Sequence, residues 1–527
     1  MSQRVLVTDT LAESGLQILR AASDLELDYR PGLKGEELLV AVTQSDALIT
    51  RSGTAVTRQL VNAGKRLRII GRAGVGLDNV DVEACTERGI LVINAPTANI
   101  LSATEHTMAM MLALCRNIPE ADASVKRGEW VRSKFMGIEL SGKVLGIIGL
   151  GRIGTRVATR ARAFGMRVVA FDPYISDSVG EKVGAELVAL DDLLRQADVI
   201  TVHTPLTGET RGMIAAAQIE KMKDGVIVLN IARGGIYDEK ALTDALQRGK
   251  IGGAAIDVYV HEPPAKDHLL LRAKNVVLSP HIGANTIEAQ DRVAVQTSEM
   301  VVDALRGSIF VSAVNLPFEG IADADAAPLI DLAEKLGLLA AQILNGPVTS
   351  AAIELWGIDE RFLRILSVAS LKGLLTPYLA ESVNFVNAEQ TAEHREISVS
   401  ATTHPVPRDY NNLITFRAAS QRDDFCVSAT LFSEKNERVV SLNNFRVEFK
   451  PAGNLIYIVN KDVPGVVGKV GTLLGDREIN IAEYNLARTA TAGKAMAIIT
   501  VDSALDPETL KFLRSFKEME EVRQVRL

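Results

Sequence analysis

The sequence contains little cysteine, few aromatic side chains and no long apolar run. Of its 527 residues 3 are cysteine, and 5% are aromatic. Cys85, Cys115 and Cys426 stand far apart, without the spacing of a metal site, so we interpret them as buried thiols in a reducing compartment. Membrane-spanning helices need roughly 18 consecutive apolar residues, and the sequence has no such run. We therefore expect no metal centre and no membrane contact.

The sequence also lacks an excess of positive charge, because its formal net charge is −7. Proteins that bind nucleic acids present basic faces to the phosphates, so we expect no nucleic-acid partner. The first residues, MSQRVLVTDT, lead directly into an expected strand and lack the basic and apolar regions of a signal peptide. These features favour a cytoplasmic protein. At roughly 100–200 residues per domain, the length predicts three or four domains.

The first part of the chain has the pattern of an α/β domain. RVLVTD, LAESGLQILRAAS and LELDY predict a strand, a helix and a strand, and DALIT and LRIIGRAG predict further short strands. No glycine-rich nucleotide loop occurs among these strands. We expect a flavodoxin-like domain that binds a substrate rather than a nucleotide.

A second, clearer βαβ pattern begins near residue 144. KVLGIIGLGRIGTRVATRARAFGMRVVAFDP predicts a buried strand, a glycine-rich turn, a helix and a strand. The units that follow predict a six-stranded, doubly wound Rossmann sheet that ends near residue 282. The amphipathic segment TIEAQDRVAVQTSEMVVDALRG then returns the chain to the first domain. We therefore expect an α/β protein in which a nucleotide domain over 98–285 is inserted in a substrate domain formed by 1–97 and 286–315.

The remaining residues change in pattern after NLPFEG. Residues 318–452 mix helical segments such as APLIDLAEKLGLLAAQIL with strands such as DDFCVSATLF, which predicts an α+β domain. Residues 453–527 have the order β-α-β-β-α-β. No catalytic group of residues stands out in either segment.

GLGRIG, at residues 149–154, has the form of a dinucleotide-binding loop. Gly149 permits the tight turn, Gly151 lets the backbone approach the pyrophosphate, and Gly154 lets the helix pack closely on the strand. The helix N-terminus stabilises the phosphates. Asp172 ends the next strand, where a carboxylate accepts hydrogen bonds from the adenosine ribose and repels a 2′-phosphate. The loop therefore predicts NAD rather than NADP as the cofactor.

Three later segments each follow a strand of this sheet, where ligands of open α/β sheets bind. LNIARGGIYDE, AAIDVYVHEPP and LSPHIGANT contain Arg233, Glu262 and His281. Each residue alone has an ordinary structural interpretation, but together they suit the oxidation of a 2-hydroxy acid. His281 would take the hydroxyl proton, Glu262 would fix its tautomer, and Arg233 would bind the carboxylate.

These motifs resemble the D-isomer-specific 2-hydroxyacid dehydrogenase family over residues 1 to about 315. The resemblance implies that His281 is the general acid and base, Glu262 its partner and Arg233 the carboxylate anchor. It also implies a set of cofactor contacts: Gly149, Gly151, Arg152, Ile153, Gly154, Asp172, Thr204, Ile231, Ala232, Asp257, Gly283, Ala284 and Val75. His106, in SATEHTMAM, stands where the family commonly has an apolar residue, and we interpret it as structural.

Additional cations and amides suit a substrate with a phosphate tail. RAGVGLDNVD, FMGIELSGKVLGIIGLGRIG and SPHIGANT resemble the long family members that oxidise 3-phosphoglycerate to begin serine synthesis. The candidate substrate contacts are Arg51, Ser52, Gly74, Val75, Asn99, Arg132 and Lys134. The alternatives are another 2-hydroxy acid, such as 2-hydroxyglutarate or the related hydroxypyruvate, and a sensor that binds NAD and an amino acid without turnover.

The two C-terminal segments resemble the additional domains of those long members. Residues 318–452 are similar to the intervening domain, and 453–527 are similar to an ACT domain, a small fold that binds amino acids between paired copies. By this resemblance Asp462 would meet an ammonium group and Asn480 a carboxylate, with L-serine as the effector. The resemblance also implies a homo-oligomer, a tetramer built from dimers.

Overall fold

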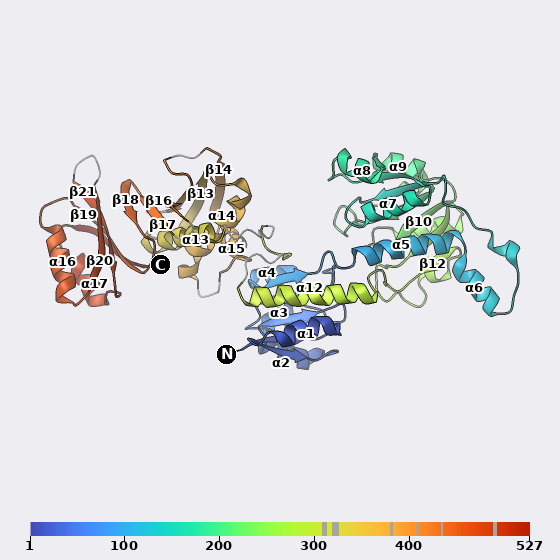
Figure 1. The fold of residues 1–527 in the computed structure, drawn as a ribbon, viewed down its shortest axis with the longest axis horizontal. Coiled ribbons are helices and arrows are strands. Elements are labelled where there is room, and N and C mark those ends of the chain that lie inside the picture. Colours follow the sequence, from blue (N-terminus) through green and yellow to red (C-terminus); the bar gives the residue numbers. More distant parts are fainter. Residues whose placement is uncertain are drawn as a thin grey trace.

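The computed structural model describes residues 2–307, 313–318, 326–379, 383–406, 409–433, 436–488 and 493–527. Four β-sheets lie one after another along an elongated molecule in the described part (Figure 1). The sheet that contains the glycine-rich loop lies at one end, and the C-terminal sheet lies at the other. The N-terminal sheet lies between the sheet that contains the glycine-rich loop and the two sheets of the C-terminal part of the chain (Figure 1).

The first sheet is parallel and has the strand order β2-β1-β3-β4-β5. This is the flavodoxin order that the sequence predicts. Its strands are β1 (Gln3–Val7), β2 (Leu25–Tyr29), β3 (Ala47–Thr50), β4 (Ile69–Arg72) and β5 (Leu91–Asn94). The accompanying helices are α1 (Glu13–Ala21), α2 (Gly35–Thr43), α3 (Arg58–Ala63) and α4 (Val82–Glu87).

The second sheet is also parallel, with the order β12-β11-β10-β9-β6-β7-β8. Its strands are β6 (Val144–Ile148), β7 (Arg167–Phe171), β8 (Ala185–Leu187), β9 (Val199–Val202), β10 (Val226–Asn230), β11 (Ile251–Ile256) and β12 (Val276–Leu278). The order is the Rossmann order, but the predicted count of six strands is wrong, because β8 adds a seventh. This edge strand has 3 residues, of which only Ala185 is buried, so it has no apolar pattern to find.

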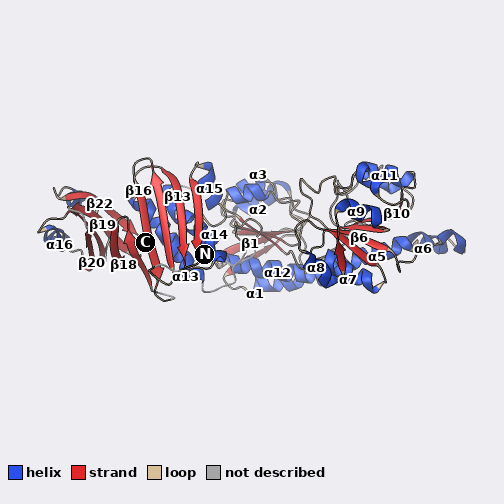
Figure 2. Cartoon of the chain, turned by 90° about the horizontal axis from the view of Figure 1, so that it is seen from above, coloured by secondary structure: helices blue, strands red, loops and turns tan. Residues whose placement is uncertain are grey.

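Seven α-helices and two 3₁₀ turns accompany the described strands of the second sheet. The helices are α5 (Ile100–Cys115), α6 (Ile118–Lys126), α7 (Gly154–Ala163), α8 (Asp177–Val183), α9 (Leu190–Gln196), α10 (Ala216–Lys221) and α11 (Glu239–Gln247), with the 3₁₀ turns η1 (Arg132–Phe135) and η2 (Leu269–Arg272). In both views α6 lies at the end of the molecule remote from the first sheet (Figures 1 and 2).

Helix α12 (Ile287–Leu305) returns the chain from the second sheet to the first, as the sequence predicts. It packs on α1, where a Cβ on Gly15 would lie 2.8 Å from the Cβ of Ala294, so only glycine permits this approach. The chain passes from the first domain to the second near Ala98 and returns through α12. A hydrogen bond joins these two crossings, since Arg292 Nε donates to the carbonyl of Ala98 at 2.9 Å. The second sheet is thus an insertion in the domain of the first.

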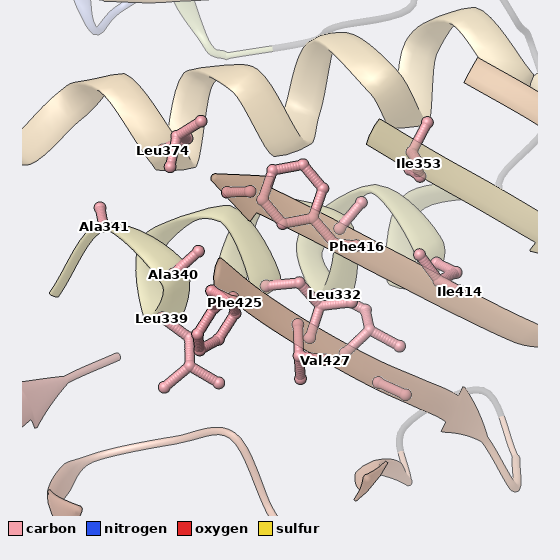
Figure 3. Close-up of a cluster of buried hydrophobic side chains, with 14 of the residues drawn as sticks. Leu332, Leu339, Ala340, Ala341, Ile353, Leu374, Ile414, Phe416, Phe425 and Val427 are labelled. Atoms are coloured by element: carbon pink, nitrogen blue, oxygen red, sulfur yellow. The ribbon is translucent and has the colours of Figure 1, made fainter. Parts of the chain in front are cut away.

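The third sheet has the order β14-β13-β15-β16-β17-β18 and is antiparallel except for the β13–β14 pair. The strands are β13 (Val348–Trp356), β14 (Ser398–His404), β15 (Leu413–Ser420), β16 (Asp424–Leu431), β17 (Glu437–Leu442) and β18 (Phe445–Phe449). Helices α13 (Ala326–Ile343), α14 (Leu363–Leu375) and α15 (Ala388–His394) accompany them, with η3 (Glu360–Phe362) and η4 (Thr376–Tyr378). Figure 3 shows leucine and alanine side chains of α13 packed against Phe416 and Phe425.

The fourth sheet has the antiparallel order β20-β21-β19-β22 and the predicted succession βαββαβ. Its elements are β19 (Asn454–Lys461), α16 (Val466–Asp476), β20 (Ile481–Arg488), β21 (Lys494–Val501), α17 (Pro507–Arg514) and β22 (Met519–Arg526). Ile456 and Ile458 face α16 and α17, whereas Leu455 and Tyr457 join the core of the third sheet. One face of the fourth sheet therefore shares an apolar core with the third sheet, and its other face forms a separate core with α16 and α17.

Within the described residues no helix is both long enough and apolar enough to span a bilayer. The three cysteines are free thiols; Cys85 and Cys115 are buried as predicted, whereas Cys426 is only partly buried.

Candidate active site

The glycine-rich loop joins β6 to α7 at the carboxyl edge of the second sheet. Gly149 has φ +91°, and a Cβ there would lie 2.8 Å from the carbonyl oxygen of His203. A Cβ on Gly154 would lie 2.2 Å from the carbonyl oxygen of Gly149, so this position tolerates only glycine. A Cβ on Gly151 has no atom within 4 Å, which leaves open space beside the loop. The backbone is therefore accessible to a pyrophosphate at the start of α7.

Asp172 follows β7 and holds the same loop. Its Oδ2 accepts a hydrogen bond from the Leu150 amide at 2.9 Å, and its Oδ1 accepts one from the Tyr174 amide at 3.0 Å. On the other side of the loop, the buried hydroxyl of Thr204 has no hydrogen-bond partner among the described residues. An orphaned hydroxyl beside a glycine-rich loop fits a bound polar ligand, since buried hydroxyls are normally paired. These residues fit a dinucleotide.

Arg233 lies in the loop after β10, which Asn230 holds in place. The Asn230 Nδ2 donates to the Arg233 carbonyl at 2.9 Å, and its Oδ1 accepts from the Ala232 amide at 3.2 Å. The Arg233 Nε lies 3.5 Å from Asp78 Oδ2 of the first domain, where the two domains face each other. Arg233 therefore faces the boundary between the domains.

His281 and Glu262 form the predicted pair. His281 Nδ1 lies 2.7 Å from Glu262 Oε2, and both side chains remain partly exposed, at 45% and 37%. The Tyr259 amide donates to the other Glu262 oxygen at 3.1 Å, which fixes the carboxylate. With Nδ1 bonded to Glu262, the second imidazole nitrogen, Nε2, is left to exchange a proton with a ligand.

Asp257 is buried beneath the segment that contains His281. Its carboxylate accepts hydrogen bonds from the amides of Ile282 and Gly283, each at 2.9 Å, and from Ser279 Oγ at 2.6 Å. Burial raises the pKa of Asp257, but the hydrogen bonds from His106, Ser279 and the two amides outweigh it, and the pKa is lowered. Asp257 is thus an ionised group that anchors this loop. The loop also packs closely on Ile231, because a Cβ on Gly283 would lie 3.3 Å from Ile231 Cγ2.

The first domain contributes a group of guanidinium cations that includes one residue the sequence analysis missed. Arg72 ends β4, and burial together with the nearby charges of Arg233 and Arg51 lowers its pKa. A Cβ on Gly74 would lie 1.5 Å from Arg72 Nη1, so glycine is required for this guanidinium to lie against the loop. Its position at the carboxyl end of a parallel strand, in GRAGVGLDNVD, was the available signal. Because the positive charges of Arg51, Arg72 and Arg233 repel one another, an anion bound between them would lower the electrostatic energy.

Most of the predicted substrate contacts of the first domain lie in loops that follow its parallel strands or just before α5. The Arg51 amide donates to Asp9 Oδ2, and Asn79 Nδ2 donates to the Arg51 carbonyl at 2.7 Å. Ser52 is exposed beside Arg51, and Val75 accepts from Asn94 Nδ2 at 2.7 Å. Asn99 precedes the first turn of α5 without a side-chain cap.

Four predicted residues do not join a site within one chain. Arg132 and Lys134 are exposed in η1, which follows α6 at the end of the molecule remote from the first domain (Figure 1). Asp462 follows β19, whereas Asn480 precedes β20, which runs parallel to β19. These two therefore lie at opposite ends of the fourth sheet, where Asp462 contacts Arg488 and Asn480 contacts Asp502.

Comparisons with known proteins identify the family of the chain. The family pattern described as D-isomer specific 2-hydroxyacid dehydrogenase, NAD binding domain, matches residues 108–283, and that of the D-3-phosphoglycerate dehydrogenase intervening domain matches 325–443. The D-3-phosphoglycerate dehydrogenase of Bacillus subtilis is 41% identical, with 99% of each chain covered. That of Methanocaldococcus jannaschii is also 41% identical, over 99% of this chain and 100% of the relative.

A solved structure is similar to part of the chain. D-lactate dehydrogenase from Aquifex aeolicus, complexed with NAD and lactic acid, is 32% identical, with a TM-score of 0.52 over 58% of this chain and 96% of that one. The chain belongs to the D-isomer-specific 2-hydroxyacid dehydrogenases, which are NAD-dependent oxidoreductases. Within that family it belongs with the D-3-phosphoglycerate dehydrogenases.

Proposed function

We propose that this enzyme oxidises 3-phospho-D-glycerate to 3-phosphooxypyruvate with NAD, the first step of L-serine biosynthesis. The observation that carries the proposal is the group of guanidiniums of Arg51, Arg72 and Arg233 where the two domains face each other, together with the His281–Glu262 pair that follows neighbouring strands of the second sheet. A substrate with a carboxylate at one end and a phosphate at the other matches more than one cation. A 2-hydroxy acid without a second anion would leave some of that positive charge uncompensated.

In this reaction the chain's own residues bind, orient and move a proton. Arg233 binds the carboxylate, with the Val75 amide as a further donor, and Arg51 and Arg72 bind the phosphate. The Gly74 amide already donates to the Arg72 carbonyl at 2.7 Å. His281 Nε2 removes the proton of the C2 hydroxyl, while Glu262 holds Nδ1–H and stabilises the imidazolium that forms. A bound NAD would supply the acceptor for the hydride that leaves C2. Glycines 149, 151 and 154 would hold its pyrophosphate, Asp172 its adenosine ribose, and Thr204 the neighbouring polar groups.

The test is the appearance of NADH when the purified protein is mixed with NAD and 3-phosphoglycerate. D-lactate, D-2-hydroxyglutarate and, in the reverse direction, hydroxypyruvate serve as competing substrates. We expect kcat/KM for 3-phosphoglycerate to exceed that for D-lactate by at least about 100-fold, because an unpaired buried cation costs about 2–3 kcal/mol. A preference for D-2-hydroxyglutarate would replace this substrate, and no NADH from any hydroxy acid would favour the amino-acid sensor.

We also assign the two C-terminal domains to regulation, with the intervening domain over 318–452 and an ACT domain over 453–527. The βαββαβ succession of the last sheet supports this assignment. Because Asp462 and Asn480 lie at opposite ends of that sheet, a single L-serine can contact both only when two copies pair. A serine titration of the initial rate, repeated with Asn480→Ala, tests this site. Inhibition that the variant retains would reject Asn480 as a contact.

A homo-oligomer, assembled as a tetramer in the cytoplasm, completes the proposal. The segment 118–138 exposes a cluster of large apolar side chains: Ile118, Val125, Trp130, Val131, Met136 and Ile138, of which Trp130 is 79% exposed and Met136 83%. Monomers rarely expose such clusters, so a second copy is the expected cover. Arg132 and Lys134 lie in the same segment, so they would reach the active site of a partner rather than their own. Light scattering should detect dimers or tetramers that Trp130→Glu dissociates, and a monomeric wild type would reject this assembly.

A further inference from the structure

His106 and Ser102 lie one turn apart on α5, on the face turned toward the segment that contains His281. Ser102 Oγ donates to the Gly283 carbonyl at 2.8 Å and is 5% exposed. His106 Nε2 lies 3.2 Å from Ser279 Oγ and 3.3 Å from Asp257 Oδ1. The helix therefore contacts residues on both sides of His281.

These contacts complete a closed hydrogen-bond network beneath the catalytic imidazole. Asp257 accepts from Ser279, Ile282 and Gly283, and its carbonyl accepts from the His281 amide at 2.8 Å. The network holds His281 at φ +54°, a left-handed conformation that non-glycine residues adopt only when their surroundings impose it. An apolar residue at position 106 would remove a donor from a buried carboxylate and so weaken the network that holds this conformation.

The location of α5 adds a second consequence. This helix starts directly after the first crossing between the two domains, where Arg292 of α12 donates to the carbonyl of Ala98. A displacement of Ala98 would reach the start of α5, and α5 contacts the backbone and side chains around His281 through Ser102 and His106. His281 is thus connected to this crossing through Ser102 and His106, which bond to Gly283 and Ser279 on either side of it.

We propose that His106, assisted by Ser102, is a positioning residue that holds the His281 loop in its reactive geometry and couples it to the domain hinge. The proposal rests on the proposed function, because it takes His281 as the catalytic acid and base. It revises the interpretation of His106 as a purely structural residue. A misplacement of about 1 Å can lower a rate by about 100-fold, so the effect should fall on turnover rather than on folding.

The experiment compares His106→Leu, His106→Gln and a control variant in the full-length enzyme. Thr104→Val is the matched control, since the buried Thr104 hydroxyl bonds only to the carbonyl of Ile100 in the same helix. We expect His106→Leu to lower kcat by about 10- to 100-fold while KM for NAD changes by less than about threefold. His106→Gln should restore most of the turnover, because the amide can donate to Asp257 and Ser279. Wild-type turnover in Thr104→Val completes the expected pattern.

A second measurement does not depend on the substrate. Hydrogen–deuterium exchange at residues 279–283 should accelerate in His106→Leu and stay at the wild-type rate in Thr104→Val and His106→Gln. Unchanged exchange together with unchanged kcat in His106→Leu would overturn the proposal, as would a loss of kcat that His106→Gln does not rescue. If the wild type oxidises no hydroxy acid, the proposed function fails, and the exchange result still decides whether His106 holds the loop.

Discussion

The two parallel sheets of the first 305 residues share one architecture and carry opposite kinds of chemistry. In the first sheet, the carboxyl ends of β3 and β4 present guanidinium groups, those of Arg51 and Arg72. In the second, the carboxyl ends present a glycine-rich turn after β6 and an imidazole–carboxylate pair after β11 and β12. Side-chain cations suit a small anion, whereas backbone amides at a helix N-terminus suit a pyrophosphate.

The comparison teaches that strand order determines where a ligand binds, and the loops determine which ligand. Both sheets direct their polar residues to the same edge because all their strands are parallel. The first sheet has no histidine, since the seven histidines of the chain begin at His106. Under the proposed function, proton transfer by an imidazole therefore belongs to the second sheet, and the substrate's charges are met by Arg51 and Arg72 of the first sheet together with Arg233 of the second.

The strongest test of this division removes the imidazole. We expect His281→Ala to lower kcat by about 10²- to 10⁴-fold, the usual contribution of a general acid and base, with NAD affinity unchanged. Steady-state kinetics and a direct titration with NAD measure the two effects. His404→Ala is the control, because His404 ends β14 in the third sheet, where its ring stacks on Trp356. Equal losses of turnover and NAD binding would contradict the role of His281.

A smaller loss is expected when the first sheet loses a cation. Arg72→Met should raise KM for 3-phosphoglycerate by about 10- to 100-fold, since a charge-assisted hydrogen bond contributes about 1.5–3 kcal/mol. NAD binding should not change, because that site belongs to the second sheet. Arg30→Met is the matched control, since Arg30 is in the same domain and pairs with Asp28. A KM for 3-phosphoglycerate that stays at the wild-type value would remove Arg72 from the phosphate site.

The complementary change in the second sheet alters cofactor choice. Asp172→Ala should weaken NAD binding by about 10-fold and improve the relative use of NADP, because it removes a carboxylate that repels the 2′-phosphate. Ratios of kcat/KM for the two cofactors measure the preference. Since Asp172 also holds the Leu150 amide, Asp172→Asn separates charge from hydrogen bonding. A preference unchanged in both variants would refute the assignment of Asp172 to the ribose.

Sequence patterns predicted the two parallel sheets, the insertion of one domain in the other and the succession of elements in the last sheet. These features have strong local signals, such as apolar strands and the GLGRIG turn. The edge strand β8 was missed because its three residues pair only with β7 and have no alternation of their own. Short edge strands depend on their neighbours more than on propensity.

The pairing of His281 with Glu262 was predictable, because each residue lies in a recognisable segment that follows a strand of the sheet, LSPHIGANT or AAIDVYVHEPP. Arg72 was not found, because an arginine at a strand end resembles a solvated charge until its burial and its proximity to Arg233 are known. The role of His106 required the distance to Asp257, from a residue 151 positions later in the chain. Contacts between remote segments leave no local pattern in the sequence.

The smallest expected effect uses the two buried cysteines as reporters, one for each domain. Burial raises the pKa of Cys85 to about 12 and that of Cys115 to about 11, so at neutral pH both remain thiols that react slowly with iodoacetamide. Cys85 belongs to the core of the first domain, and Cys115 ends α5 in the second. Each thiol should therefore be labelled only when its own domain opens, and at a higher rate as the pH rises.

Ligands should separate the two reporters. NAD at about three times its Kd should slow labelling of Cys115 about fourfold and leave Cys85 unaffected, since a ligand stabilises only the domain that binds it. Mass spectrometry of the labelled peptides gives both rates, with the partly buried Cys426 as the internal control. Equal protection of Cys85 and Cys115 would mean that the two domains unfold as one cooperative unit. The two sheets would then differ in the groups they offer to ligands but not in their free energy of unfolding.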